Sequence, residues 1–169
     1  MIINTNEKSI YRADFKPFST ITSISIPNNV IVIEDTTFKK CTLLQKIVIP
    51  SSVTTIGKKA FYDCKSLKNI TIPNSVQYLG DSAFARCSSL KQIIIPSSIS
   101  VVESSTFRDC TSLSEVEIPF SITKINEYSF FNCTSLKKID IPSSVQLIGD
   151  SSFYGCSSLT SINIPVSVE

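Results

Sequence analysis

Six cysteines are the side chains of this 169-residue chain with the widest range of chemistry. They stand 23 residues apart, at Cys41, Cys64, Cys87, Cys110, Cys133 and Cys156. An even number of cysteines is typical of a secreted scaffold held by disulfides. A metal site is disfavoured, because the chain has no histidine and no two cysteines separated by two residues. Disulfides and buried free thiols remain as the two interpretations.

Serine is the other nucleophile that recurs. Serine catalysis normally requires an adjacent base, usually histidine, which the sequence lacks. We therefore expect these hydroxyls to hydrogen-bond backbone groups at the corners of a repeating unit. The two columns are Ser52, Ser75, Ser98, Ser121, Ser144 and Ser167, and Ser66, Ser89, Ser112, Ser135 and Ser158.

The element that positions these residues is a 23-residue repeat without insertions or deletions. Seven Ile-Pro dipeptides follow the same period, with prolines at Pro27, Pro50, Pro73, Pro96, Pro119, Pro142 and Pro165. A period of about 20 to 50 residues is the mark of a solenoid, whose units bury their apolar faces only by stacking on their neighbours. The sequence predicts one repeat domain over residues 1–169, with a degenerate N-terminal repeat or cap at 1–26 and regular repeats at 27–169, the last incomplete.

Each coil is predicted to contain one short strand. Ile70 and Ile72 alternate with Asn69 and Thr71, which is the pattern of a strand with one buried face. Pro73 then ends the strand, because it has no N–H to donate. Stacking in register predicts seven parallel strands about 4.8 Å apart. They run from residues 24–26 to residues 162–164.

The return path of each coil carries glycine at Gly57, Gly80 and Gly149, which suggests a turn with positive φ. The segment after it, such as residues 81–86, is expected to form a short helix or 3₁₀ turn.

An in-register stack favours buried thiols over disulfides. Neighbouring cysteines would point the same way at a spacing of about 4.8 Å, whereas a disulfide requires Cβ atoms about 3.8 Å apart with suitable directions. Phe18 occupies the cysteine position of the first repeat, so that position behaves as an apolar pocket.

The repeat, written L-x-x-I-x-I-P-x-S-V-x-x-I-G-x-x-A-F-x-x-C-x-S, resembles the BspA-like branch of the leucine-rich-repeat family. Ala83, Phe84 and Cys87 match its A-F-x-x-C element, and the resemblance covers nearly the whole chain. It implies a curved right-handed solenoid with parallel strands on the concave face and turns or short helical segments on the convex side. The family is often associated with cell-surface adhesion and protein binding, and the resemblance brings no catalytic residues.

The outward strand positions vary between repeats and are therefore the candidate partner-binding surface. Val48 and Ile94 are apolar there, whereas Glu115, Glu117 and Asp140 gather negative charge. Such a mixed face suits a protein partner. Ordinary solvated sheet surface, with side chains chosen for strand propensity, is the alternative. The candidate residues are Lys46, Val48, Asn69, Thr71, Gln92, Ile94, Glu115, Glu117, Lys138 and Asp140.

Two other groups of side chains have less definite roles. The lysines Lys68, Lys91 and Lys137 form a partial basic row, which favours a solvated rim over a phosphate-binding stripe. The aromatic residues Tyr62, Tyr128, Phe131 and Tyr154 form either a second contact patch or partly buried packing.

Composition excludes some classes of partner. The net charge of +2, from 16 basic and 14 acidic residues, gives no field for binding nucleic acid. No apolar run approaches the roughly 20 residues needed for membrane insertion. Residues 1–18 lack the apolar stretch of a secretory signal, which predicts a cytoplasmic protein, with the cell surface by an unconventional route as the alternative.

We therefore expect a non-enzymatic module, without a cofactor, that binds a protein or peptide. The alternative is a structural or adhesion element that forms homo-oligomers through an open C-terminal edge, because unpaired strand groups invite addition.

Overall fold

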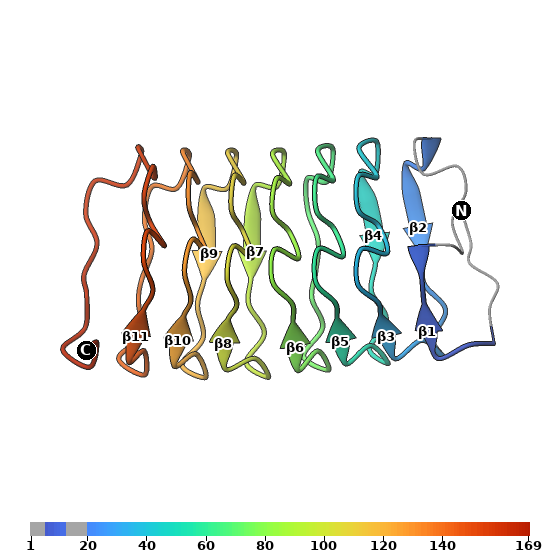
Figure 1. Cartoon of the computed structure of the whole chain (residues 1–169), viewed down its shortest axis with the longest axis horizontal. Coiled ribbons are helices and arrows are strands. Elements are labelled where there is room, and N and C mark those ends of the chain that lie inside the picture. Colours follow the sequence, from blue (N-terminus) through green and yellow to red (C-terminus); the bar gives the residue numbers. More distant parts are fainter. Residues whose placement is uncertain (1–5, 13–19) are drawn as a thin grey trace.

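The computed structural model describes residues 6–12 and 20–169 as a single stack of coils (Figure 1). Equivalent residues of successive coils lie opposite each other, as in the pairs Ile24 with Ile47 and Ile125 with Ile148. This pairing places residues 23 apart side by side and confirms the solenoid of the leucine-rich-repeat type. Part of the expected cap at 1–26, including Phe18, lies outside the described residues.

One side of the stack carries the strands predicted from the Ile-x-Ile-Pro pattern. They are β2 (Ser23–Ser25), β4 (Lys46–Val48), β7 (Gln92–Ile94) and β9 (Glu115–Glu117). Strands β2 and β4 pair in parallel, as do β7 and β9, and Asp140 forms an isolated parallel bridge with Asn163. This side is therefore a series of short pairs, and the expected continuous seven-stranded sheet is wrong.

A second side of each coil carries strands that the repeat pattern does not predict. They are β1 (Ser9–Ile10), β3 (Val32–Ile33), β5 (Thr55–Ile56), β6 (Tyr78–Leu79), β8 (Val101–Val102), β10 (Lys124–Ile125) and β11 (Leu147–Ile148). They form one sheet in the order β1-β3-β5-β6 and another in the order β8-β10-β11, visible as the lower row of arrows in Figure 1. Each strand has only two residues, too few to show an alternating pattern.

The third side is a ladder of turns, and the expected short helix is wrong for the described residues. Tyr62 N–H bonds the carbonyl of Lys59 within its own coil, whereas Phe61 N–H bonds Ala83 of the next coil at 2.8 Å. Alternate N–H groups thus point along the stack to the next coil. In a helix, every N–H would instead bond a carbonyl four residues earlier in its own coil. Positive φ at Lys59 (55°) and Asp63 (63°) produces this alternation. Equivalent residues with positive φ are Thr36, Lys40, Ser82, Arg86, Ser105, Asp109, Tyr128, Asn132, Ser151 and Gly155.

The prediction of positive φ at the consensus glycines is wrong; these glycines allow two backbones to approach closely. A Cβ placed on Gly80 would lie 2.6 Å from the backbone nitrogen of Lys58 in the preceding coil. Positive φ falls at Lys59 and Ser82, two residues after Gly57 and Gly80. Glycine is used here because the backbones of two coils approach closely.

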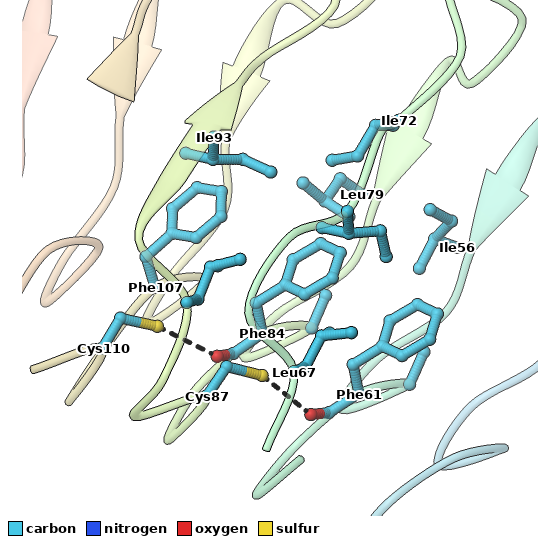
Figure 2. Close-up of a cluster of buried hydrophobic side chains, with 14 of the residues drawn as sticks. Ile56, Phe61, Leu67, Ile72, Leu79, Phe84, Cys87, Ile93, Phe107 and Cys110 are labelled. Atoms are coloured by element: carbon cyan, nitrogen blue, oxygen red, sulfur yellow. Dashed lines mark hydrogen bonds between the residues drawn. The ribbon is translucent and has the colours of Figure 1, made fainter. Parts of the chain in front are cut away.

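The core is a set of columns that run the length of the stack (Figure 2). Phe61, Phe84 and Phe107 are fully buried, and their rings stack with centroids 5.1 and 5.8 Å apart. Leucine, isoleucine and valine columns surround the rings, so that each coil packs mainly on the coils before and after it.

Candidate functional site

We call the outward side chains of residues 46–48, 69–71, 92–94, 115–117 and 138–140 the variable face. All ten candidate residues are exposed on it, whereas the alternating Ile47, Ile70, Ile93 and Ile139 are buried. Val48 and Ile94 leave 55% and 58% of their surface exposed. The face therefore presents apolar groups that core packing does not require.

The variable face is interrupted at residues 69–72. This segment lies between β4 and β7 in the stack, but it pairs with neither strand. Among the described residues, none bonds to the N–H or C=O groups of Asn69, Ile70, Thr71 or Ile72. Contacts just outside the segment connect it to the adjacent coils, as where Lys91 N–H bonds the carbonyl of Lys68.

Two hollows flank this unpaired segment. The first has a volume of about 580 Å³ and lies between Val48 and Thr71, with Lys46 and Lys68 at its edge. The second has a volume of about 350 Å³ and lies between Thr71 and Ile94. Asn69, Ile70 and Thr71 line both, so the segment forms a ridge between them. Pockets that hold drug-sized ligands have volumes of roughly 300 to 1,000 Å³.

The missing strand pairing has a signal in the sequence. The two segments that fail to pair with β4, β7 or β9, at 69–71 and 138–140, carry Asn69 and Asp140 at outward positions. Asparagine and aspartate are more strongly depleted in strands than the Gln, Ile and Glu that β7 and β9 carry at those positions.

Charge divides the variable face into two parts. Lys46 and Lys68 lie beside the first hollow, while Glu115 and Glu117 lie on β9, directly opposite Gln92 and Ile94 of β7. Asp140 forms an ion pair with Lys138 at 2.8 Å, although both side chains are largely exposed. The uncompensated acidic part of the face is therefore Glu115 with Glu117.

The cysteines are buried free thiols, as favoured above. The Cys87 thiol donates to the carbonyl of Phe61 at 3.2 Å, and the Cys110 thiol donates to the carbonyl of Phe84 at 3.2 Å (Figure 2). Each bond joins one coil to the coil before it. Burial raises the pKa of Cys110 to about 12, so this thiol is neutral and is no nucleophile at neutral pH.

The first serine column has the expected structural role. Ser75 Oγ donates to the carbonyl of Val53 at 2.7 Å, and Ser121 Oγ donates to the carbonyl of Ile99 at 2.6 Å. In the second column, Ser135 Oγ donates to the carbonyl of Thr111. The hydroxyls of Ser75, Ser121 and Ser135 thus connect neighbouring coils.

The aromatic residues of the turn side include a packed cluster. Phe131 stacks on Tyr154 with centroids 5.3 Å apart and meets Tyr128 edge-on. The guanidinium of Arg108 lies 4.8 Å from the Phe131 ring centroid. Because these groups contact one another, packing explains the cluster, although Tyr154 remains 68% exposed.

Within the described residues, no three His, Cys, Asp or Glu side chains are grouped as a metal site. No helix found there has the length and apolar character to cross a bilayer.

Sequence comparison agrees with this geometry. The repeats match the BspA type leucine rich repeat region in six copies, over residues 8–134 and 100–169. The chain belongs to the BspA-type leucine-rich-repeat family. No curated protein matches it.

Solved structures of bacterial leucine-rich-repeat proteins are similar to this chain. A leucine rich cell surface protein from Faecalibacterium prausnitzii is 31% identical with a TM-score of 0.82, and the alignment covers 95% of this chain and 48% of that one. A leucine-rich repeat protein from Bacteroides ovatus is 31% identical with a TM-score of 0.75, covering 95% and 47%. The leucine-rich repeat protein of T. pallidum is 29% identical with a TM-score of 0.82, covering 89% and 71%. The chain thus spans about half the length of the first two proteins.

Proposed function

We propose that this chain is a non-enzymatic binding module that engages a protein or peptide through the variable face. One observation supports this most strongly: Val48 and Ile94 are more than half exposed beside two hollows, on a face where the repeat fixes only the buried side chains. Exposed apolar groups flanked by charge are typical of a contact surface, in which the apolar groups supply affinity and the charges set orientation.

The resemblance to a repeat family brings no catalytic residues to the chain, which supports a binding role over an enzymatic one. The F. prausnitzii protein is described as a cell surface protein. This similarity favours the cell surface over the cytoplasm for this chain as well. Labelling of intact cells with a reagent that does not enter them tests this location. A chain that is labelled only after the cells are lysed would contradict a place at the cell surface.

A photo-crosslinking residue at position 71 tests the binding face. Thr71 lies between the hollows. We expect a variant with the crosslinker in its place to form an adduct of defined mass with a partner protein from a cell-surface extract. The matched control carries the crosslinker in place of Ser100, which is exposed next to β8 on the second side of the stack. Equal adducts from both positions would contradict the assigned face.

Charge reversal provides the complementary test. Glu115→Lys with Glu117→Lys reverses the uncompensated acidic part of the face, whereas Glu127→Lys changes an exposed carboxylate on the side of β10 and β11. We expect only the first change to reduce adduct formation, because charge near the contact sets the rate of association. An identical yield from both variants would contradict the role of Glu115 and Glu117.

A further inference from the structure

Strand pairing along the variable face is broken at residues 69–72. The N–H and C=O groups of this segment make no hydrogen bond to β4 or β7, and the segment borders a hollow on each side. Asn69 and Thr71 are exposed on this segment, between the hollows. Any ligand that covers the segment therefore meets these two polar side chains as well as apolar walls.

These features select an extended ligand. A bound helix satisfies its own backbone groups, so it would leave those of residues 69–72 unpaired. An extended peptide that lies along the stack points alternate side chains at the same face, about 6.6 Å apart, and so offers them to successive hollows. Apolar side chains pointing from one edge of such a peptide would enter hollows bordered by Val48 and Ile94.

The spacing of the coils defines the pattern of that peptide. The first hollow lies between the coils of Val48 and Thr71, so two and a half steps of 23 residues separate it from the coil of Glu117. At about 4.8 Å per step this distance is about 12 Å. Four residues of extended chain, at about 3.3 Å each, cover about 13 Å. Side chains i and i+2 then reach the two hollows, and side chain i+4 reaches Glu115 and Glu117.

Electrostatics fixes the charge of the third side chain. Glu115 and Glu117 are exposed on β9 and form no ion pair with any residue that the structure describes, whereas the nearby Asp140 is paired with Lys138. A lysine or arginine at i+4 would compensate the two carboxylates.

We propose that the variable face binds an extended peptide segment with apolar side chains at i and i+2 and a basic side chain at i+4. The peptide lies along the stack, across the ridge of residues 69–72. This inference rests on the proposed function and names the class of partner that the same face takes.

The test uses synthetic peptides labelled with a fluorophore. The probe has isoleucine at i and i+2 and lysine at i+4 in a threonine and serine background. One control peptide has glutamate at i+4, and another has the two isoleucines at i and i+1. Fluorescence anisotropy measures the dissociation constants for the full chain. We expect the probe to bind about tenfold more tightly than either control, which corresponds to one well-placed contact.

Variants of the chain connect this binding to the hollows. Thr71→Trp places a large side chain on the ridge and should weaken the probe at least about tenfold. The control Ser100→Trp, away from the variable face, should leave binding unchanged. Glu115→Lys with Glu117→Lys should reverse the preference, so that the glutamate peptide binds more tightly than the probe. Circular dichroism of each variant establishes that the fold is retained.

Several results would overturn the inference. They are failure of the probe to bind the folded chain at millimolar concentration, equal binding of the three peptides, and binding that Thr71→Trp leaves unchanged. If no peptide binds while the crosslinker at position 71 still captures a folded protein, this inference fails and the proposed function stands. If neither peptide nor protein contacts position 71, both fail.

Discussion

Raising the pH is expected to destabilise this protein through its buried thiols, and Cys110 allows the size of the effect to be calculated. Its side chain is fully buried and donates to the carbonyl of Phe84. Burial raises the pKa of Cys110 from 9.0 to about 12. The unfolded chain therefore loses this proton at a lower pH than the folded chain does, and the stability that the thiol contributes below pH 9.0 falls as the pH rises toward 12.

The magnitude follows from the two pKa values. Between pH 7.5 and pH 10, linkage predicts a loss of about 1.4 kcal/mol from Cys110 alone, because one pKa unit corresponds to about 1.4 kcal/mol. The full difference of three pKa units, reached only near pH 12, would be about 4 kcal/mol.

Urea unfolding followed by circular dichroism measures this loss. The wild-type chain and Cys110→Ala are unfolded at pH 7.5 and at pH 10 under reducing conditions. Lysine, tyrosine and the more distant cysteines titrate in both proteins, so the difference between the two pH effects reports on Cys110 together with its coupling to Cys87 and Cys133. We expect the wild-type chain to lose about 1.4 kcal/mol more than the variant. An equal loss in the two proteins would refute the assignment of a buried, neutral thiol.

Three further substitutions test the stack. Phe84→Ala removes a ring that contacts Phe61 and Phe107, and it should lower the free energy of unfolding by about 3 to 5 kcal/mol. Urea denaturation measures it, and a loss below about 1 kcal/mol would contradict the continuous core. Gly80→Ala brings a Cβ within 2.6 Å of the backbone nitrogen of Lys58 and should lower the free energy of unfolding by about 1 to 3 kcal/mol. Glu103→Ala, at the same position of the next repeat, should lower it less. Equal losses of stability would contradict the close approach of the two backbones at Gly80. Ser121→Ala removes the bond to Ile99 and should cost about 1 kcal/mol, with no change in stability as the contrary result.

The buried side of the molecule could be predicted from its sequence because periodicity carries that information. The 23-residue spacing of Phe84, Cys87 and Ile93 with their equivalents specifies which residues stack, and the structure buries them in register. The free thiols also followed, since a stack that aligns cysteines does not give them disulfide geometry.

The turn side could not be predicted in the same way. Lys59 and Asp63 adopt positive φ although neither is glycine, while the nearby Gly57 does not. Backbone bonds between coils, such as Lys59 N–H to the Asp81 carbonyl at 2.9 Å, stabilise these conformations. Such bonds depend on the neighbouring coil, so local propensity does not report them.

The candidate site was only partly visible in the sequence. The outward positions of Val48, Ile94 and Glu117 follow from strand alternation. The hollows arise because residues 69–72 do not pair, and only the low strand propensity of Asn69 pointed to this. The Lys138–Asp140 ion pair, which reduces the acidic part to two carboxylates, depends on side-chain geometry that periodicity does not specify.

Amide hydrogen exchange of the free chain tests most directly the claim that the variable face opens at the ridge. The N–H groups of Ile70 and Thr71 make no hydrogen bond to a neighbouring coil, whereas those of Phe61 and Phe84 bond the next coil at 2.8 and 2.9 Å. We predict rapid exchange at Ile70 and Thr71, in the middle of the stack, and slow exchange at Phe61 and Phe84. Protection of Ile70 and Thr71 equal to that of Phe61 and Phe84 would show a closed sheet without free backbone groups and would contradict the account.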